Sequence, residues 1–246
     1  MITVKNLWFS YDAQVILEDV NLTIKQGEFI AVIGPNGGGK TTLIKLILGI
    51  LKPQRGEITV LGQPPKAAAR RMGYVPQNAN NSKVFPISVM DVALMGRLGK
   101  AGRAWRYSEA DRRRAEEALD RVGMLEHKKS PVLNLSGGQR QRVFIARALA
   151  SDPEILFMDE PTASVDQEWQ AQIYNLLKEL NKSITIVVVS HDISILSSYV
   201  KSVACVNRTV YYHDAAEITE EMLGKMYQCP VELVAHGVPH RVLQSH

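Results

Sequence analysis

The segment GPNGGGKT, residues 34 to 41, limits the fold of this 246-residue chain more than any other feature. It matches the pattern G-x-x-x-x-G-K-[ST], and it lies between the apolar run EFIAVIG (28–34) and the helix-length run TTLIKLILGIL (41–51). This order indicates a strand, a loop and a helix, in which the loop presents backbone N–H groups to a phosphate. A plain glycine turn would not explain the lysine and threonine. The segment therefore predicts a nucleotide phosphate site formed by Gly34, Pro35, Asn36, Gly37, Gly38, Gly39, Lys40, Thr41 and Thr42.

Further apolar runs predict a parallel sheet. EILFMDE (154–160) and ITIVVVSHD (184–192) are apolar enough to be strands covered on both faces, with a helical period between them. Short alternating segments before residue 65 indicate an antiparallel flank, and two helical patterns fall within 78–134. We therefore expect an α/β fold with a P-loop core, an antiparallel β flank and an inserted α-helical subdomain. The expected division is 1–77 and 135–213 for the core with its flank, 78–134 for the helical subdomain, and 214–246 for a C-terminal helix and tail.

Composition narrows the classes of function. The net charge of +4, from 29 basic and 25 acidic residues, is too small and too dispersed to argue for a nucleic-acid partner. Two cysteines, Cys205 and Cys229, provide no disulfide framework. No window approaches the roughly 18 apolar residues of a spanning helix, and the N-terminus has no apolar signal core. Any membrane role is therefore expected to come through a partner.

Candidate groups for the chemistry follow the two predicted inner strands. Asp159 and Glu160 are adjacent, so their side chains should point to opposite sides of the strand. Asp159 would then hold Mg²⁺, while Glu160 polarises the attacking water. His191 follows the next strand at the sheet edge where ligands bind, and Gln77 in GYVPQN can reach the metal or the water. Without the phosphate loop, each would be interpreted as a solvated or structural residue. The expected Mg²⁺ contacts are Thr41, Gln77 and Asp159, and the expected catalytic residues are Gln77, Glu160 and His191.

A second anion-binding pattern occurs in LNLSGGQRQR, residues 133 to 142. A Ser-Gly-Gly run that opens a helix leaves N–H groups free to bind an anion. The alternative is a helix cap, because Ser136 is a good N-cap residue. The two uses are compatible, since both employ the same N–H groups.

The motifs GPNGGGKT, GYVPQN, LSGGQ, ILFMDE, SVD (164–166) and SHD (190–192), in this order, resemble the nucleotide-binding subunit of ATP-binding cassette transporters over nearly the whole chain. The resemblance implies an ATPase that uses ATP and Mg²⁺. It also implies that two copies pack head to tail as an ATP-sandwich dimer, so that LSGGQ contacts the γ-phosphate of ATP held by Lys40 of the other copy. Asp166 would cross that interface, and Tyr11 would stack on adenine, with aromatic packing as the alternative for Tyr11. The nucleotide contacts implied in this way are Tyr11, Ser136, Gly137, Gly138, Gln139 and Asp166.

The cargo and the partners rest on the same resemblance. A single cassette without a spanning segment implies a separate integral membrane permease, a peripheral position on the cytoplasmic face of the membrane, and indirectly an extracytoplasmic solute-binding protein. FPISVMDVALMGR (85–97) and the C-terminal MYQCPVELVAHGVPHRVL are similar to cassettes that energise uptake of zinc, manganese or iron. Two alternatives stay open: a cassette of an exporter or other importer, and a non-transport cassette acting on nucleic acid or ribosomes.

The C-terminal tail carries residue types that ligate metals. His236 and His240 have i, i+4 spacing, but Gly237 and Pro239 disfavour the helix that would align them. We therefore expect a docked or disordered tail in preference to a metal sensor built from Cys229, His236, His240 and His246.

Overall fold

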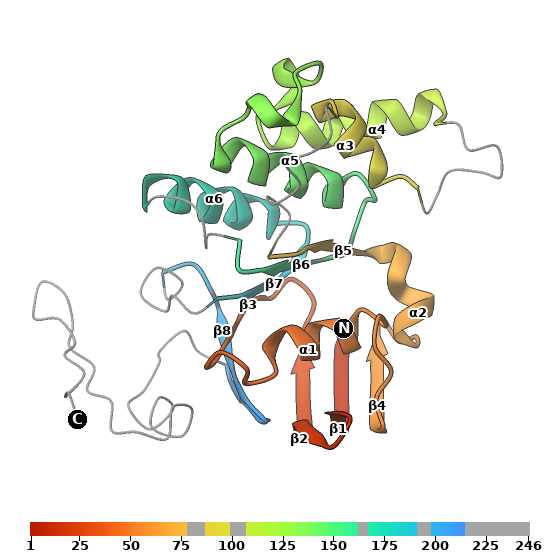
Figure 1. The fold of residues 1–246 in the computed structure, drawn as a ribbon, viewed down its shortest axis with the longest axis vertical. Coiled ribbons are helices and arrows are strands. Elements are labelled where there is room, and N and C mark those ends of the chain that lie inside the picture. Colours follow the sequence, from red (N-terminus) through yellow and green to blue (C-terminus); the bar gives the residue numbers. More distant parts are fainter. Residues whose placement is uncertain (78–86, 99–106, 162–166, 191–197, 215–246) are drawn as a thin grey trace, which may run out of the picture.

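The computed structural model describes residues 1–77, 87–98, 107–161, 167–190 and 198–214, and its strands form two sheets (Figure 1). The first sheet is antiparallel, in the order β2 (Gln14–Ile24), β1 (Ile2–Tyr11) and β4 (Arg55–Val60). The second has the order β5 (Met72–Val75), β6 (Ile155–Asp159), β7 (Thr185–Val189), β3 (Phe29–Ile33), β8 (Ser202–Asn207) and β9 (Thr209–His213). Its strands pair in parallel except for the final β8–β9 pair.

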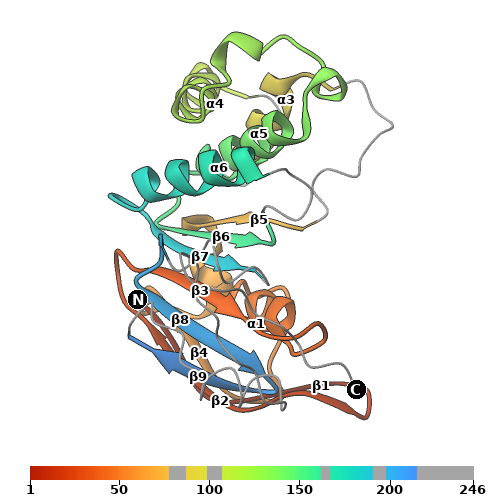
Figure 2. The same cartoon turned by 90° about the vertical axis from the view of Figure 1, so that its left-hand side faces the viewer.

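Helices pack on both faces of the six-stranded sheet (Figures 1 and 2). On one face, α1 (Lys40–Ile47) packs between this sheet and the antiparallel sheet. On the other face lie α5 (Gly137–Leu149) and α6 (Gln167–Leu180), with α3 (Val89–Met95) and α4 (Glu109–Arg121) beyond them. Alternate residues of β3 enter the two cores, Ile30 and Val32 on the α1 side and Phe29, Ala31 and Ile33 on the α5 side. This explains why β3, β6 and β7 are apolar throughout rather than alternating.

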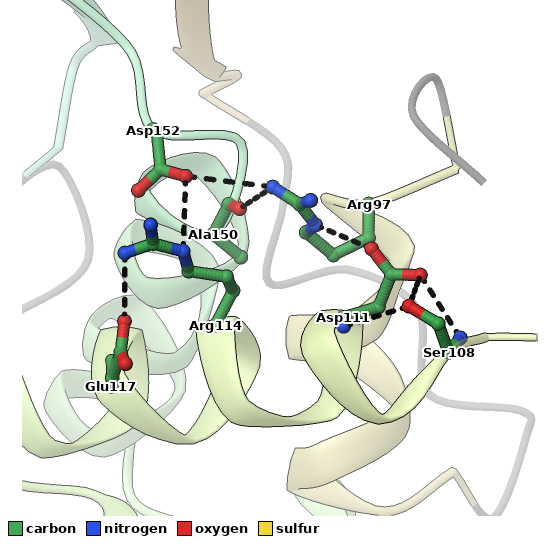
Figure 3. Close-up of polar contacts among 7 residues, drawn as sticks. All are labelled: Arg97, Ser108, Asp111, Arg114, Glu117, Ala150 and Asp152. Atoms are coloured by element: carbon green, nitrogen blue, oxygen red, sulfur yellow. Dashed lines mark hydrogen bonds and ion pairs between the residues drawn. The ribbon is translucent and has the colours of Figure 1, made fainter.

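A network of ion pairs and hydrogen bonds joins the C-terminal ends of α3 and α5 to the start of α4 (Figure 3). The Arg97 guanidinium pairs with Asp111 at 2.9 Å and donates to the carbonyl oxygen of Ala150 at 3.0 Å. Asp152 lies 3.6 Å from the same guanidinium. The hydrogen bond from the Ser108 side chain, and next in size the one from Arg97, lower the pKa of Asp111 to about 2. This network, which we call the Arg97 clasp, holds three helices in one arrangement.

The predicted fold class is confirmed, with its parallel sheet, antiparallel flank and helical region. Sequence reasoning misses the short elements β5 and α2 (Pro65–Ala68). It also does not foresee that β8, which forms a hairpin with β9, pairs in parallel with β3. The domain division stays a prediction, and α5, which begins just after the expected boundary, packs against α3 and α4. The helix expected within 214–246 lies outside the described residues. Among the helices that the structure describes, none is long and apolar enough to cross a membrane.

Candidate functional site

The phosphate loop joins the end of β3 to the start of α1, as predicted. Gly39 is the N-cap residue of α1, with a left-handed φ of 102° and no side-chain cap. Gly34 and Gly37 also have positive φ values, 151° and 78°. These conformations favour glycine and turn the backbone toward the open end of the helix. The first turn of α1 therefore begins without a capping side chain, which leaves its N–H groups available to an anion.

Lys40 places a buried cation in this first turn. Its side chain donates to the carbonyl oxygens of Gly34 and Pro35, each at 2.9 Å, and the residue is only 6% exposed. Burial lowers the pKa of Lys40, while the nearby carboxylates of Glu160 and Asp159 oppose that lowering. A buried ammonium whose hydrogen bonds go to neutral carbonyls favours the arrival of an anion.

The loop also packs against the β8–β9 hairpin, and no sequence motif predicts this contact. A Cβ atom on Gly34 would lie 2.0 Å from the carbonyl oxygen of Val206, and one on Gly38 would lie 2.8 Å from the same atom. The backbone N–H of Arg208 donates to the carbonyl of Gly38 at 3.1 Å. Glycine is therefore required here for packing as well as for the approach of a phosphate.

Asp159 ends β6 and faces Thr41. The Thr41 hydroxyl donates to Asp159 Oδ1 at 3.3 Å, and the Tyr74 hydroxyl approaches Oδ2 at 3.5 Å. Burial raises the pKa of Asp159, which the hydrogen bond from Thr41 opposes. Burial, reinforced by the Asp159 charge, raises the pKa of Tyr74 to about 12. Sequence reasoning misses Tyr74 because it does not predict β5.

Glu160 lies just beyond β6 in a left-handed conformation, with φ 47°. Such a conformation is strained for a residue other than glycine, and it recurs at functional sites. Its backbone N–H donates to the carbonyl of Val189 at 2.9 Å, and its Oε2 accepts from Gln77 Nε2 at 2.8 Å. The two carboxylates thus have different partners, as expected. The turn at Glu160, rather than strand alternation, separates them.

The end of β7 lies at the same sheet edge, since the N–H of Ser190 donates to the carbonyl of Val32 at 3.2 Å. His191 follows directly but lies outside the described residues, as do Asp166 and the tail with its cysteine and histidines. The roles expected of these residues stay predictions.

Tyr11 lies at the tip of the β1–β2 hairpin, where it pairs with Gln14. Its ring meets that of Phe9 edge-on, with centroids 4.9 Å apart, and the residue is 44% exposed. The hairpin runs beside the phosphate loop, because a Cβ on Gly39 would lie 2.7 Å from a methyl of Leu17. Tyr11 therefore packs against Phe9, which is the alternative to adenine stacking, and part of its side chain remains exposed.

The start of α5 is capped, as expected of Ser136. The Ser136 hydroxyl accepts from the N–H of Gln139 at 3.2 Å, and Gln139 Oε1 accepts from the N–H of Ser136 at 2.9 Å. This reciprocal pair is a capping box. The helices α3 and α4 begin in the same way, with aspartate at the third helical position: Ser88 with Asp91, and Ser108 with Asp111. A neutral amide at that position distinguishes α5 from both neighbours.

Gly138 packs against α6. A Cβ there would lie 2.6 Å from Cε3 of Trp169, and the guanidinium of Arg142 lies 5.4 Å from the centre of the same indole. The second glycine of the Ser-Gly-Gly run is therefore required for packing within the chain, which sequence reasoning does not foresee.

Comparisons with known proteins agree with this geometry. The family model described as ABC transporter matches residues 17–163. The manganese transport system ATP-binding protein MntB of Bacillus subtilis is 44% identical over 195 residues, which are 79% of this chain and 78% of that protein. The zinc transport system ATP-binding protein TroB of Treponema pallidum is 40% identical over 229 residues, 92% of this chain and 86% of that protein.

Solved structures show the same fold. A metal-chelate type ABC transporter in an inward-facing conformation has a TM-score of 0.84 and 31% identity, covering 94% of this chain and 90% of its own. A dimeric ATP-binding cassette in a post-hydrolysis state, bound to ADP and phosphate, has a TM-score of 0.74 and 30% identity, covering 89% of this chain and 100% of its own. The chain therefore belongs to the ABC transporter family, in which it is an ATP-binding cassette, the ATPase subunit.

Proposed function

We propose that this chain hydrolyses ATP to energise the uptake of a divalent metal ion through a separate membrane permease. The ATPase rests on the convergence of Lys40, Asp159 and Glu160 at one sheet edge. The cargo class rests on the relatives, which are manganese and zinc transport proteins at 44% and 40% identity. Iron, the third metal expected from the sequence, belongs to the same class of cargo.

The phosphate loop would bind the nucleotide. Backbone N–H groups of residues 36–39 would wrap the β-phosphate, and Lys40 would exchange its hydrogen bonds to Gly34 and Pro35 for bonds to the β and γ phosphates. Tyr11, on the neighbouring hairpin, would stack on the adenine with its exposed surface.

Mg²⁺ suits the oxygen donors beside this loop. The hydroxyl of Thr41 and the carboxylate of Asp159 already face each other, and hard oxygen ligands are those that Mg²⁺ prefers. The buried Asp159 carboxylate would gain most from a cation, because burial penalises its charge. Gln77 would contribute its amide oxygen, since its nitrogen is bonded to Glu160. Bound Mg²⁺ would neutralise charge that develops on the phosphates.

Glu160 is the group that would activate water. Its carboxylate is fixed by a strained turn and by Gln77, so it is oriented before a substrate arrives. It would accept a proton from the attacking water, and Gln77 would orient that water. His191, which follows β7, would contact the γ-phosphate.

A second copy would complete each site. The helices α1 and α5 pack on opposite faces of the six-stranded sheet, so the start of α5 belongs to a different layer from the phosphate loop (Figures 1 and 2). A head-to-tail partner would bring the segment from Ser136 to Gln139 to the γ-phosphate, with Asp166 at the interface. The dimeric state of the ADP-bound neighbour supports this arrangement.

The permease would dock in a groove of about 570 Å³ between the α3 end and β5. We call it the docking groove. Its walls include Met72 and Tyr74 on one side, and Met95 and Leu98 on the other. Met95 and Leu98 are 41% and 57% exposed, and exposed large apolar side chains of this kind mark protein interaction sites. Tyr74 connects the groove to the site, because its hydroxyl faces Asp159. This would place the chain on the cytoplasmic face of the membrane, with an extracytoplasmic solute-binding protein acting indirectly.

The substitution Glu160→Gln tests the proposal. It keeps size and the bond to Gln77 but removes the proton acceptor, so ATP hydrolysis should fall roughly 10²- to 10⁴-fold while ATP binding persists. Glu179→Gln, the same change in a surface pair on α6, is the control and should be near wild type. Measurements on membranes with the permease should show ATP-dependent accumulation of zinc or manganese that Glu160→Gln abolishes. Wild-type turnover in Glu160→Gln would move the general base elsewhere, and export or an organic cargo would refute metal uptake.

A further inference from the structure

The docking groove contains a cation, Arg147, that has no carboxylate partner among the described residues. Arg147, in the last turn of α5, lines the groove, and its guanidinium lies 5.2 Å from the ring centre of Phe144. Among the residues that the structure describes, no carboxylate forms an ion pair with Arg147. Burial lowers the pKa of this guanidinium, though an arginine side chain stays charged in proteins. The described part of the chain therefore provides no carboxylate for a partly dehydrated positive charge, which is unfavourable.

Nearby carboxylates are already committed to other cations. Asp111 and Asp152 belong to the Arg97 clasp, where Asp152 also faces Arg114 at 3.6 Å (Figure 3). Glu154 forms a two-pronged pair with Arg71, with one contact at 2.7 Å. Recruiting any of them to Arg147 would break an existing pair.

The sequence segments that follow Gln77 and Leu98 contain no acid either. NANNSKVFP (78–86) and GKAGRAWR (99–106) contain no aspartate or glutamate, and the second adds three basic residues. Arg70, which also lines the groove, is exposed and basic. An apolar groove in basic surroundings matches an apolar segment that carries negative charge.

We propose that Arg147 is the specificity-determining cation of the docking groove, and that the permease segment which fills the groove presents an aspartate or glutamate to its guanidinium. This inference rests on the proposed function only for the identity of the partner as a permease. Docking would expel water around Arg147, so a carboxylate with two parallel N–H···O bonds would bind strongly and a neutral segment would bind poorly. Apolar residues of the same segment would cover Met95 and Leu98.

Arg147→Met, Arg147→Glu and Arg147→Lys in the full-length chain provide the test, with Arg121→Glu on the exposed far end of α4 as a control for charge. Titration against the detergent-solubilised permease should show binding weakened about tenfold or more by methionine and more by glutamate, with lysine in between, and unchanged in the control. The melting temperature of isolated Arg147→Met should equal or exceed that of wild type, because the substitution removes an unpaired, partly buried charge. A residue with a merely structural role would not weaken binding while preserving stability.

Charge exchange identifies the partner atom. Cross-linking from Leu98→Cys should identify the permease segment, and replacing its acidic residue with arginine should restore binding to Arg147→Glu. Equal permease binding by wild type, Arg147→Met and Arg147→Glu would overturn the inference while leaving the proposed function intact. A cross-linked segment without a carboxylate would do the same. A lower melting temperature for Arg147→Met would show that contacts within the chain already stabilise the charge of Arg147, which also overturns the inference. Failure of the wild-type chain to bind any permease would refute both this inference and the proposed function.

Discussion

The helices α1 and α5 both begin at glycine-rich segments, yet their first turns are built differently. α1 starts at Gly39 without a side-chain cap and carries the buried cation Lys40. α5 starts at Ser136, whose capping box with Gln139 uses the helix's own side chains, and its first three residues are uncharged. The difference teaches that α1 combines uncapped N–H groups with a buried cation, whereas α5 offers its capped N-terminus without any charge.

The neighbours of α5 sharpen this comparison. α3 and α4 close their capping boxes with Asp91 and Asp111, which favour the positive end of the helix dipole. At α5 the same position is Gln139, which closes the box without negative charge. A carboxylate there would stabilise the helix equally well and would repel a phosphate. The neutral amide is therefore the choice expected where an anion from another copy must approach.

The largest expected effect is on the stability of the helical region that contains α5, with no effect on ATP binding at α1. Arg97→Met leaves the carboxylate of Asp111 buried without its guanidinium, which should lower the free energy of unfolding by about 3 kcal/mol. ATP affinity should stay the same, because α1 lies on the other face of the sheet. Urea unfolding and nucleotide titration measure the two quantities.

Arg114→Met is the matched control in the same network. Arg114 is half exposed and pairs with Glu117 at 3.0 Å, so its loss should cost less than about 1 kcal/mol. A parallel fall in ATP affinity for Arg97→Met would show that the nucleotide site at α1 is not independent of the helices that Arg97 joins.

Lys40→Ala should weaken ATP binding about 30- to 150-fold, the loss of a charged hydrogen-bond donor worth about 2–3 kcal/mol. Lys45→Ala, in the last turn of the same helix, should leave affinity near wild type. Isothermal titration of ATP into the monomeric protein measures both. Equal losses in the two variants would mean that general positive charge, rather than the first turn of α1, binds the phosphates.

Gly138→Ala should lower the free energy of unfolding by about 1–3 kcal/mol, because its methyl group overlaps the indole of Trp169. Adding Trp169→Leu should recover part of this loss, and ATP affinity should not change. Gly34→Ala should cost more, since it meets the backbone carbonyl of Val206 and has a positive φ. Additive effects of Gly138→Ala and Trp169→Leu in unfolding experiments would contradict the proposed contact.

Elements marked by an apolar run, a helical period or a glycine-rich loop could be predicted from the sequence. Elements that depend on contacts with distant parts of the chain could not. β3, β6 and β7 are uniformly apolar because both their faces are covered, and the glycine loop marks where α1 begins. β5 has four residues and is a strand because it pairs with β6, so neither its existence nor the position of Tyr74 follows from local pattern.

The same limit applies within the site. Lys40, Thr41 and Asp159 could be placed together because a phosphate loop and an inner strand of one parallel sheet end at the same edge. The packing of Gly34 on Val206 and of Gly138 on Trp169 could not, because tertiary approach alone decides which residue fills the space beside a glycine. Within the described part of the chain, the lack of a carboxylate partner for Arg147 likewise depends on which carboxylates other cations have taken.

Gln139→Glu in a Glu160→Gln background tests most directly whether α5 completes a site on another copy. The change keeps the capping box and the helix stability, and it adds one negative charge where the partner's γ-phosphate is expected. Asn175→Asp, the same amide-to-carboxylate change on an exposed position of α6, is the control. Sedimentation with ATP and Mg²⁺ should show dimers for Glu160→Gln and for the control, but monomers for Gln139→Glu, with equal ATP affinity and melting temperature in all three. A Gln139→Glu protein that dimerises with ATP as readily as the control would contradict the shared site and leave the second glycine-rich segment as a helix cap.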